Sequence, residues 1–159
     1  MHSTRNDLPE VTRGKVIELL DARLADATDL QTQLKQAHWN VKGPSFIALH
    51  ELFDKVNEAV EDYVDELAER VVQLGGFAHG TARQVAKRST LPEYPAVTAG
   101  RDHVEAVATA LATFAKLART GIDQADELGD KDTADIFTEI SRGTDKWLWF
   151  VEAHVQADR

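Results

Sequence analysis

The 159-residue sequence predicts an all-α protein that folds as a four-helix bundle. Apolar residues recur with the 3.6-residue period of a helix over four long stretches, whereas alternating, strand-like runs are scarce. Only four prolines interrupt the chain, namely Pro9, Pro44, Pro92 and Pro95. A chain of this length can bury a sizeable core without disulfides, and we therefore expect one domain.

The first two long helices are expected over residues 12–40 and 45–74. Gly43-Pro44 interrupts the chain between them, and Ser45 is a candidate N-cap for the second helix. Gly75-Gly76 marks its end, because glycine is favoured just after a helix. Apolar positions at helical spacing are expected to face the core: Val16, Leu19, Leu20, Leu24, Ala27, Leu30, Leu34 and Ala37, then Leu49, Leu52, Phe53, Val56, Ala59, Val60, Tyr63, Val64, Leu67, Val71 and Leu74.

The second half of the chain repeats this plan after a long connection. Residues 76–99 carry a short helical piece at 82–87 and a proline-punctuated stretch, LPEYP. The third long helix is expected over 100–128, weakened by Gly121, and the fourth from Asp130 to near residue 155. One long crossover between two helix pairs is typical of ferritin-like bundles. We therefore expect a short tail over residues 1–11 and a ferritin-like domain over 12–156.

Composition excludes several classes of function. The chain has no cysteine, which rules out disulfides, cysteine-ligated zinc and thiol catalysis. We find neither a signal-peptide pattern nor an apolar run of 18 residues, so we expect a cytoplasmic protein that does not enter a membrane. The net charge of −9 favours cations over nucleic acids as partners.

One stripe of the second helix carries candidate metal ligands. His50, Asp54, Asp65 and Glu69 fall within about 100° of one another on a helical wheel, outside the apolar arc. His50 and Glu69 are nevertheless about 28 Å apart along a straight helix, so one chain cannot place all four on one ion. The sequence midpoint of His50 and Glu69 lies between residues 59 and 60, and so does the midpoint of Asp54 and Asp65. Two such helices crossing antiparallel at that point would bring the members of each pair together, which predicts a metal site shared between two subunits.

The same stripe is also consistent with a solvated acidic face. Residues 51–70 contain eight acids against Lys55 and Arg70, and Glu58 and Glu61 share the same midpoint. Imidazole with carboxylates suits Fe(II), Mn(II) or Zn(II), and the stripe does not choose among them. No histidine has Glu three residues before it, so we do not expect the Glu-x-x-His centre of di-iron bundles within one subunit. His38 ends the first helix, and the Gly43-Pro44 turn brings it towards His50.

This segment resembles the Dps proteins, the DNA-binding proteins from starved cells or mini-ferritins. The resemblance extends from about residue 7 to 154, and its motifs are HWNVKGP at 38–44, FIALHELFD at 46–54, DELAER at 65–70, DTADIF at 132–137 and DKWLWF at 145–150. It implies four-helix subunits that assemble as hollow homododecamers. It also implies ferroxidase centres at two-fold interfaces, with His38, His50 and Asp54 from one subunit and Asp65 and Glu69 from its partner. The implied activity is oxidation of Fe(II), preferably by hydrogen peroxide, with ferric mineral stored in the cavity as protection against oxidative damage. Zn²⁺ and Mn²⁺ are expected as competitors of iron.

The resemblance suggests further roles for individual residues. Trp39 is similar to a family tryptophan that can donate electrons near the centre, although plain interface packing would explain it equally well. Arg70 and Asp145 match family positions and are expected to form an ion pair supporting assembly. Acids near the start of the fourth helix resemble those lining an iron-entry pore: Glu127, Asp132 and Asp135, with Asp130 less secure because it also suits a helix N-terminus.

DNA binding is expected to be weak or absent. Residues 1–15 carry a net charge of only +1, from Arg5, Arg13 and Lys15 against Asp7 and Glu10. A dodecamer would carry about −108, twelve times −9, which repels a phosphate backbone. The leading hypothesis is thus an iron-storing ferroxidase. A nucleoid-compacting DNA protein with secondary iron chemistry is the alternative, and only then would the protein lie in the nucleoid. A third hypothesis is a purely structural cage, or a cage with another activity such as amide hydrolysis. The sequence shows no arrangement of nucleophile and base that would support such an activity.

Overall fold

The computed structural model describes residues 1–157, which form five helices. These are α1 (Glu10–Asn40), α2 (Phe46–Gln73), α3 (Ala82–Arg88), α4 (Gly100–Glu127) and α5 (Lys131–Gln156). Within the described residues the only β-type pairing is a single bridge between Lys42 and Ala99. The predicted all-α bundle with a short extra helix is confirmed, and the helix bounds differ from the expected ones by no more than two residues.

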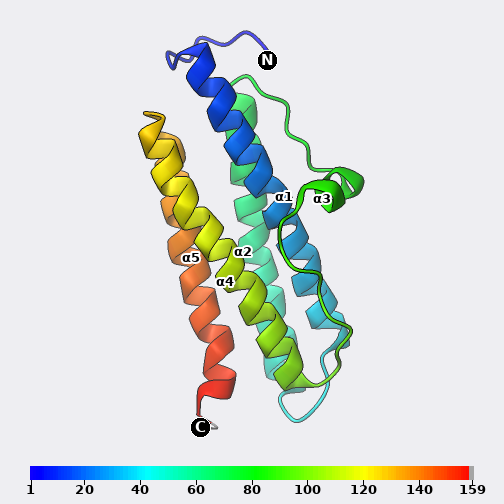
Figure 1. Cartoon of the computed structure of the whole chain (residues 1–159). Helices are drawn as coiled ribbons and strands as arrows, with labels where there is room; N and C mark the ends of the chain where they lie inside the picture. The colour runs from blue at the N-terminus through cyan, green and yellow to red at the C-terminus, as the bar shows by residue number, and fades with distance from the viewer. Residues whose placement is uncertain (158–159) are drawn as a thin grey trace.

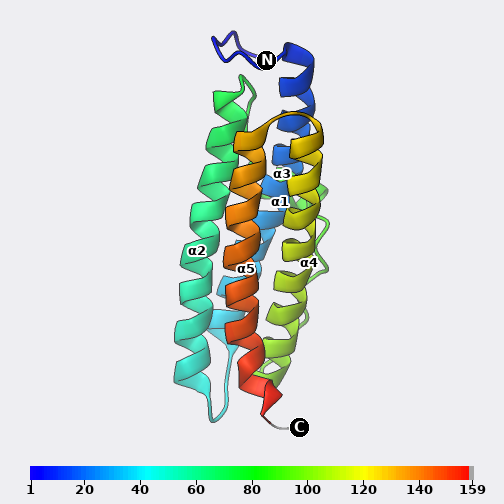
Figure 2. The same ribbon diagram turned by 90° about the vertical axis from the view of Figure 1, so that its left-hand side faces the viewer.

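Two antiparallel helix pairs form the bundle (Figure 1). The helices α1 and α2 pack together along their lengths, as do α4 and α5, and α4 also contacts α1. The connection from α2 to α4 runs down the outside of the bundle, and α3 lies within it against α1. In the perpendicular view α2, α5 and α4 stand side by side with nearly parallel axes (Figure 2).

The core lies between these four helices and follows the predicted apolar faces. Its largest fully buried side chains include Phe53, Phe114 and Phe137, each of which contributes about 1.5–3 kcal/mol on burial. Most of the positions predicted for α1 and α2 are buried. The exceptions are partly buried residues at the edges of the apolar arcs: Leu19, Leu52, Ala59 and Val64.

Glycines end α2 and α4 by the same device. Gly75 has a φ of +89°, and the amides of Gly75 and Gly76 bond to the carbonyl oxygens of Val72 and Val71. This is a Schellman motif, so the predicted stop signal at Gly75-Gly76 is confirmed. Gly129, with a φ of +81°, closes α4 in the same way.

The structure adds detail at two positions singled out in the sequence. Ser45 is at the predicted N-cap position of α2, although its side chain makes no capping hydrogen bond. Gly121 lies inside the continuous helix α4, and a Cβ there would lie 3.1 Å from the ring of Phe137. The glycine therefore allows the close approach of α5 to α4, which explains its place inside a helix.

The residues before α1 are folded back over the end of α2. The amide of His2 donates to the carbonyl of Gly75 at 2.7 Å, and Arg13 Nη1 donates to the carbonyl of Leu74 at 2.9 Å. Among the described helices, none is long and apolar enough to cross a membrane.

Candidate metal centre

The end of α1 and the start of α2 bring two candidate ligands into contact. The rings of His38 and His50 stack with their centroids 3.7 Å apart and their planes inclined by 19°. Gly43, with a φ of +115°, allows the tight turn between the helices. The backbone of Lys42 bonds to Thr98 and Gly100 and so fixes this turn to the start of α4. The predicted approach of His38 to His50 is confirmed.

Reciprocal hydrogen bonds set the orientation of both histidines. His38 Nδ1 lies 2.7 Å from the carbonyl oxygen of His50, and His50 Nδ1 lies 2.8 Å from the carbonyl oxygen of His38. A carbonyl oxygen only accepts, so each Nδ1 carries a proton and donates it. In a neutral imidazole, Nε2 then keeps its lone pair for a metal, as in histidine ligands oriented by a backbone carbonyl. The pair thus presents two ligand atoms with no change of tautomer.

Asp54 follows His50 by one turn and is held by a cation from α1. Lys35 Nζ donates to Asp54 Oδ1 at 2.6 Å. This hydrogen bond lowers the pKa of the Asp54 carboxyl, and the nearby histidines act in the same direction, so the group is a carboxylate at neutral pH. The sequence analysis missed Lys35. Its position three residues before His38, on the same helix face, was the available signal.

The other two candidates on α2 do not meet the histidines in the same chain. Asp65 and Glu69 are exposed and lie several turns further along the helix. Across residues 1–157, no three His, Asp or Glu side chains of one chain are grouped closely enough to hold a metal ion. The structure therefore brings His38 beside His50, places Asp54 one turn away, and leaves Asp65 and Glu69 facing outward.

Exposed apolar side chains flank the ligand stripe. Ile47 and Val72 are 60% and 58% exposed. On the helical wheel both lie within the about 100° stripe of the candidate ligands. They also share the midpoint between residues 59 and 60, so an antiparallel copy of α2 would bring each against the other. Such a crossing would bury both side chains, a feature that the sequence analysis had not noticed.

A further carboxylate beside this stripe is unfavourably placed in the single subunit. Glu66 is partly buried, and its Oε2 has no hydrogen-bond partner. Burial raises the pKa of the Glu66 carboxyl, and the charges of Glu139, Asp62 and Asp65 raise it further. The acidic character of this face therefore has a measurable energetic cost.

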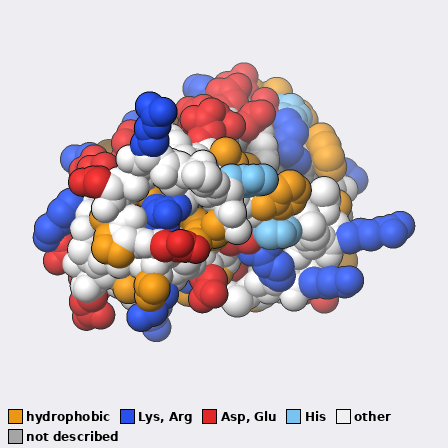
Figure 3. Space-filling model, turned by 90° about the horizontal axis from the view of Figure 1, so that it is seen from above, with side chains coloured by type: hydrophobic (Ala, Val, Ile, Leu, Met, Phe, Trp, Pro, Cys, Tyr) orange, Lys and Arg blue, Asp and Glu red, His pale blue; other side chains and the backbone are white. Residues whose placement is uncertain are grey.

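The candidate pore acids divide into two groups. Glu127, Asp132 and Asp135 are exposed near the turn between α4 and α5. Asp130 is only 2% exposed; it accepts from the amide of Thr133 as the N-cap of α5 and pairs with Arg70 at 2.9 Å. Since its charge is buried and neutralised, we remove Asp130 from the pore candidates. Figure 3 views this end of the bundle and shows clusters of acidic side chains with Lys and Arg between them.

The expected ion pair of Arg70 with Asp145 is absent within the described subunit, where each has another partner. Arg70 is buried and donates to Asp130, Thr133 and Gln73. Asp145 is exposed and pairs with Arg119 at 2.8 Å. Arg70 thus ties the end of α2 to the start of α5.

Trp39 lies beside the histidine pair but points away from the core. It is 67% exposed, and its ring lines a groove of about 940 Å³ between α1, α3 and the connection that follows α3. A large exposed ring next to His38 is consistent both with interface packing and with electron donation to the site.

Comparisons with known proteins identify the family and the fold. The ferritin-like domain family matches residues 17–159. The "DNA protection during starvation protein" of Agrobacterium fabrum is 47% identical over 156 residues, covering 98% of this chain and 96% of that protein. The "Fine tangled pili major subunit" of Haemophilus ducreyi is 33% identical, covering 93% of this chain and 78% of its own length. Mycobacterium smegmatis Dps superposes with a TM-score of 0.92 at 32% identity, covering 97% of this chain and 94% of that one.

A bundle of two helix pairs joined by one long crossover, matched over most of its length, defines a ferritin-like protein. Within that class the chain belongs to the Dps family, as its near full-length identity to the Agrobacterium protein and its superposition on Mycobacterium Dps show. The resemblance seen in the sequence and the ferritin-like fold are both confirmed.

Proposed function

We propose that the protein oxidises Fe(II) at centres shared by two subunits and stores the ferric product inside a dodecameric cage. The single observation that carries this proposal is the histidine pair, whose reciprocal backbone hydrogen bonds leave two Nε2 atoms free as ligands. Two imidazoles with nearby carboxylates form a suitable donor set for Fe(II). Zn²⁺ and Mn²⁺ suit the same donors and are expected to compete.

The second subunit supplies the ligands that one chain lacks. An antiparallel crossing of two α2 helices between residues 59 and 60 would bring Asp65 and Glu69 of the partner subunit to His38, His50 and Asp54. The same crossing would cover the two large apolar side chains of the stripe, Ile47 and Val72, which are exposed in the single subunit. Burial of apolar surface would drive the pairing, and the metal would neutralise the carboxylates gathered there.

Hydrogen peroxide is the proposed oxidant. One peroxide accepts two electrons, so two Fe(II) at one centre reduce it to water without releasing hydroxyl radical. The residues of the chain hold the irons: His38 and His50 through Nε2, and Asp54 with the partner subunit's Asp65 and Glu69 through carboxylate oxygens. Glu127, Asp132 and Asp135 would attract the cations at an entry pore.

DNA binding is not part of the proposal. The Agrobacterium relative is named for DNA protection, but this chain carries a net charge of −9. Its first residues also pack on the end of α2 through the bond of His2 to Gly75. Supercoiled DNA at neutral pH without divalent ions should show little or no retardation in a gel. Clear retardation at submicromolar dodecamer would contradict this prediction.

The decisive experiment adds Fe(II) anaerobically and then peroxide, following ferric absorbance and peroxide consumed. We expect about two Fe(II) oxidised per peroxide. The double substitution His50→Ala with Asp54→Ala should abolish the fast phase. Glu58→Ala with Glu61→Ala is the matched control, because these acids lie on the same face and share the same midpoint but are not proposed ligands. Equal rates in both double variants would show that His50 and Asp54 are not the site.

A further inference from the structure

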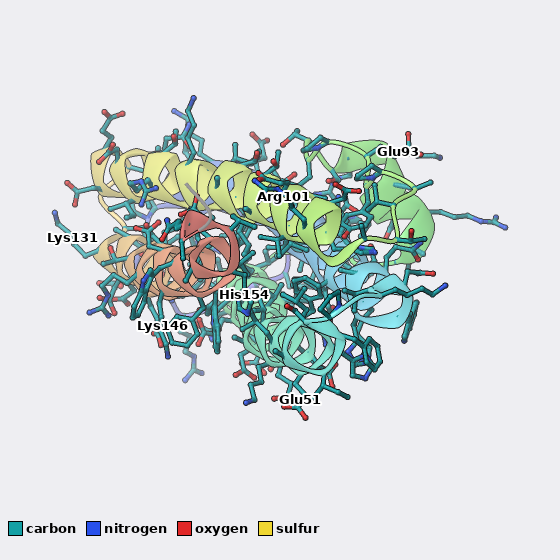
Figure 4. The ribbon with its side chains drawn as sticks, turned by 90° about the horizontal axis from the view of Figure 1, so that it is seen from below. Glu51, Glu93, Arg101, Lys131, Lys146 and His154 are labelled. Carbon is teal, nitrogen blue, oxygen red and sulfur yellow. The ribbon has the colours of Figure 1, made fainter. Side chains whose placement is uncertain are left out.

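A tyrosine–histidine pair, with the histidine buried and the tyrosine partly buried, lies on the side of α4 that faces the end of α1. Tyr94, on the connection before α4, places its hydroxyl 2.7 Å from Nδ1 of His103. Their rings are stacked at 24° with centroids 5.9 Å apart. The neighbouring Glu93 projects outward from the same connection (Figure 4). His103 is completely buried.

The pair is a neutral phenol donating to a neutral imidazole. Burial lowers the pKa of His103, with the backbones of Asn40 and Val97 opposing this effect, and burial raises the pKa of Tyr94. In the tautomer that carries its proton on Nε2, His103 accepts the phenol O–H at Nδ1. Nε2 is buried, and the backbone groups of Asn40 and Val97 lie close enough to the imidazole to raise its pKa.

The pair is connected to the metal-binding segment from two sides. Tyr94 and Trp39 line the same groove, and Trp39 follows His38 in the chain. His103 lies close enough to the backbone of Asn40, the last residue of α1, for that backbone to act on its pKa. The bonds of the Lys42 backbone to Thr98 and Gly100 hold this end of α1 to the start of α4. The pair therefore lies close to the end of α1 that carries His38.

We propose that Tyr94, with His103 as its proton acceptor, supplies the second electron for peroxide reduction when a centre holds only one Fe(II). This inference rests on the proposed ferroxidase function and extends it to partly loaded sites. Oxidation makes a phenol strongly acidic, so tyrosine loses an electron readily only where a base can take its proton. A neutral His103 with an accepting Nδ1 is such a base.

The step balances without any other reactant. The O–O bond of peroxide breaks and takes one electron from Fe(II) and one from Tyr94, which gives two hydroxide ions and Fe(III). The phenol O–H bond breaks, its proton binds Nδ1 of His103, and Tyr94 becomes a neutral radical. A second Fe(II) arriving later returns one electron to Tyr94, and His103 returns the proton. The sum is two Fe(II) per peroxide with no hydroxyl radical released, even when irons arrive singly.

The test uses the whole protein loaded anaerobically with one Fe(II) per centre, mixed with one peroxide and frozen within milliseconds for electron paramagnetic resonance. The chain has only two tyrosines, which gives a matched pair of variants. We expect a tyrosyl signal that Tyr94→Phe abolishes and that Tyr63→Phe leaves unchanged. Spin-trapped hydroxyl radical should rise at least severalfold in Tyr94→Phe under the same conditions.

His103 requires a readout that a purely structural role would not change. His103→Gln keeps a hydrogen-bond acceptor for the phenol, its amide oxygen, but has no base that can take the phenol proton. We expect a lower radical yield and an altered g-value from the changed hydrogen bond, in a variant whose helix content and assembly match the parent protein. Should His103→Gln fail to assemble, Tyr94→Phe against Tyr63→Phe still decides the matter.

Two results would overturn the proposal: a tyrosyl signal that persists in Tyr94→Phe, or no tyrosyl signal in the parent protein while single-iron turnover proceeds. Failure of the proposed function is a separate result, because the parent protein would then not oxidise Fe(II) with peroxide even at two irons per centre. Tyr94→Phe should leave that two-iron rate unchanged.

Discussion

Replacing Lys35 with Gln should tighten the binding of the first Fe(II) by about 1.4- to 5-fold. Lys35 Nζ lies 2.6 Å from Asp54 Oδ1, so a metal that takes this carboxylate must displace the ammonium group. The two side chains are 32% and 39% exposed, so water screens the pair. Partly exposed pairs contribute about 0.2–1 kcal/mol. Since about 1.4 kcal/mol corresponds to a factor of ten, this range gives the stated change in affinity.

The assay is anaerobic equilibrium dialysis with Fe(II) at fixed ionic strength. Lys55→Gln is the control, because it removes the same charge from the residue after Asp54 while its side chain lies towards α5. A gain confined to Lys35→Gln would support direct competition between ammonium and metal. Equal gains in both variants would attribute the effect to net charge, and unchanged or weaker binding in Lys35→Gln would refute the reasoning.

Three further predictions follow from the geometry of the subunit. Ile47→Asp should dissociate the assembly, which would appear as a fall in sedimentation coefficient. Val11→Asp should not, because Val11 is also an exposed apolar residue but lies outside the ligand stripe of α2. Glu66→Gln should raise the melting temperature at pH 7. The gain in the free energy of unfolding should be less than about 1 kcal/mol. Because the folded-state pKa of Glu66 is raised, wild-type stability falls as pH rises above about 4.5, so the gain should vanish below that pH. Because the folded-state pKa of His103 is lowered, the free energy of unfolding measured with denaturant should decline as pH falls below about 6.5. His103→Gln should lessen this decline. An equal decline in both proteins would contradict the prediction.

Local signals were sufficient to predict the helices. The period of apolar residues placed each long helix, and Gly75 stopped α2 at the predicted position because its φ of +89° suits a residue without a Cβ. Local reasoning did not reveal the packing role of Gly121. There, the absent Cβ serves the packing of Phe137 across helices, and no local pattern shows which neighbour a glycine will face.

The candidate site could be predicted only where its residues share one helix or one turn. Spacing placed His50 and Asp54 on one stripe, and the Gly43-Pro44 turn brought His38 to them. The hydrogen bond of Lys35 to Asp54, and that of Tyr94 to His103, join side chains from different elements. Such contacts depend on how helices pack, which composition and periodicity do not determine.

Asp130 shows why acids near a helix start are ambiguous in sequence. An N-cap and a pore lining both require a short acidic side chain after a turn. In the structure, the buried guanidinium of Arg70, 60 positions earlier and near the end of α2, decides between the two roles. The pairing partner is a feature of the tertiary structure. Asp132 also lies 3.8 Å from Arg70 but is 84% exposed, and Asp135 is exposed as well, so both remain pore candidates.

Metal loading and assembly should be thermodynamically linked in this protein. The face of α2 that carries Asp65 and Glu69 also holds Glu58 and Glu61, and the proposed crossing brings like charges together around its midpoint. Repulsion of this kind opposes pairing. A divalent ion bound between the subunits removes part of that repulsion and so stabilises the interface. By linkage, pairing of the subunits strengthens metal binding by the same free energy. The acids that look superfluous as ligands therefore make iron binding and subunit pairing mutually dependent.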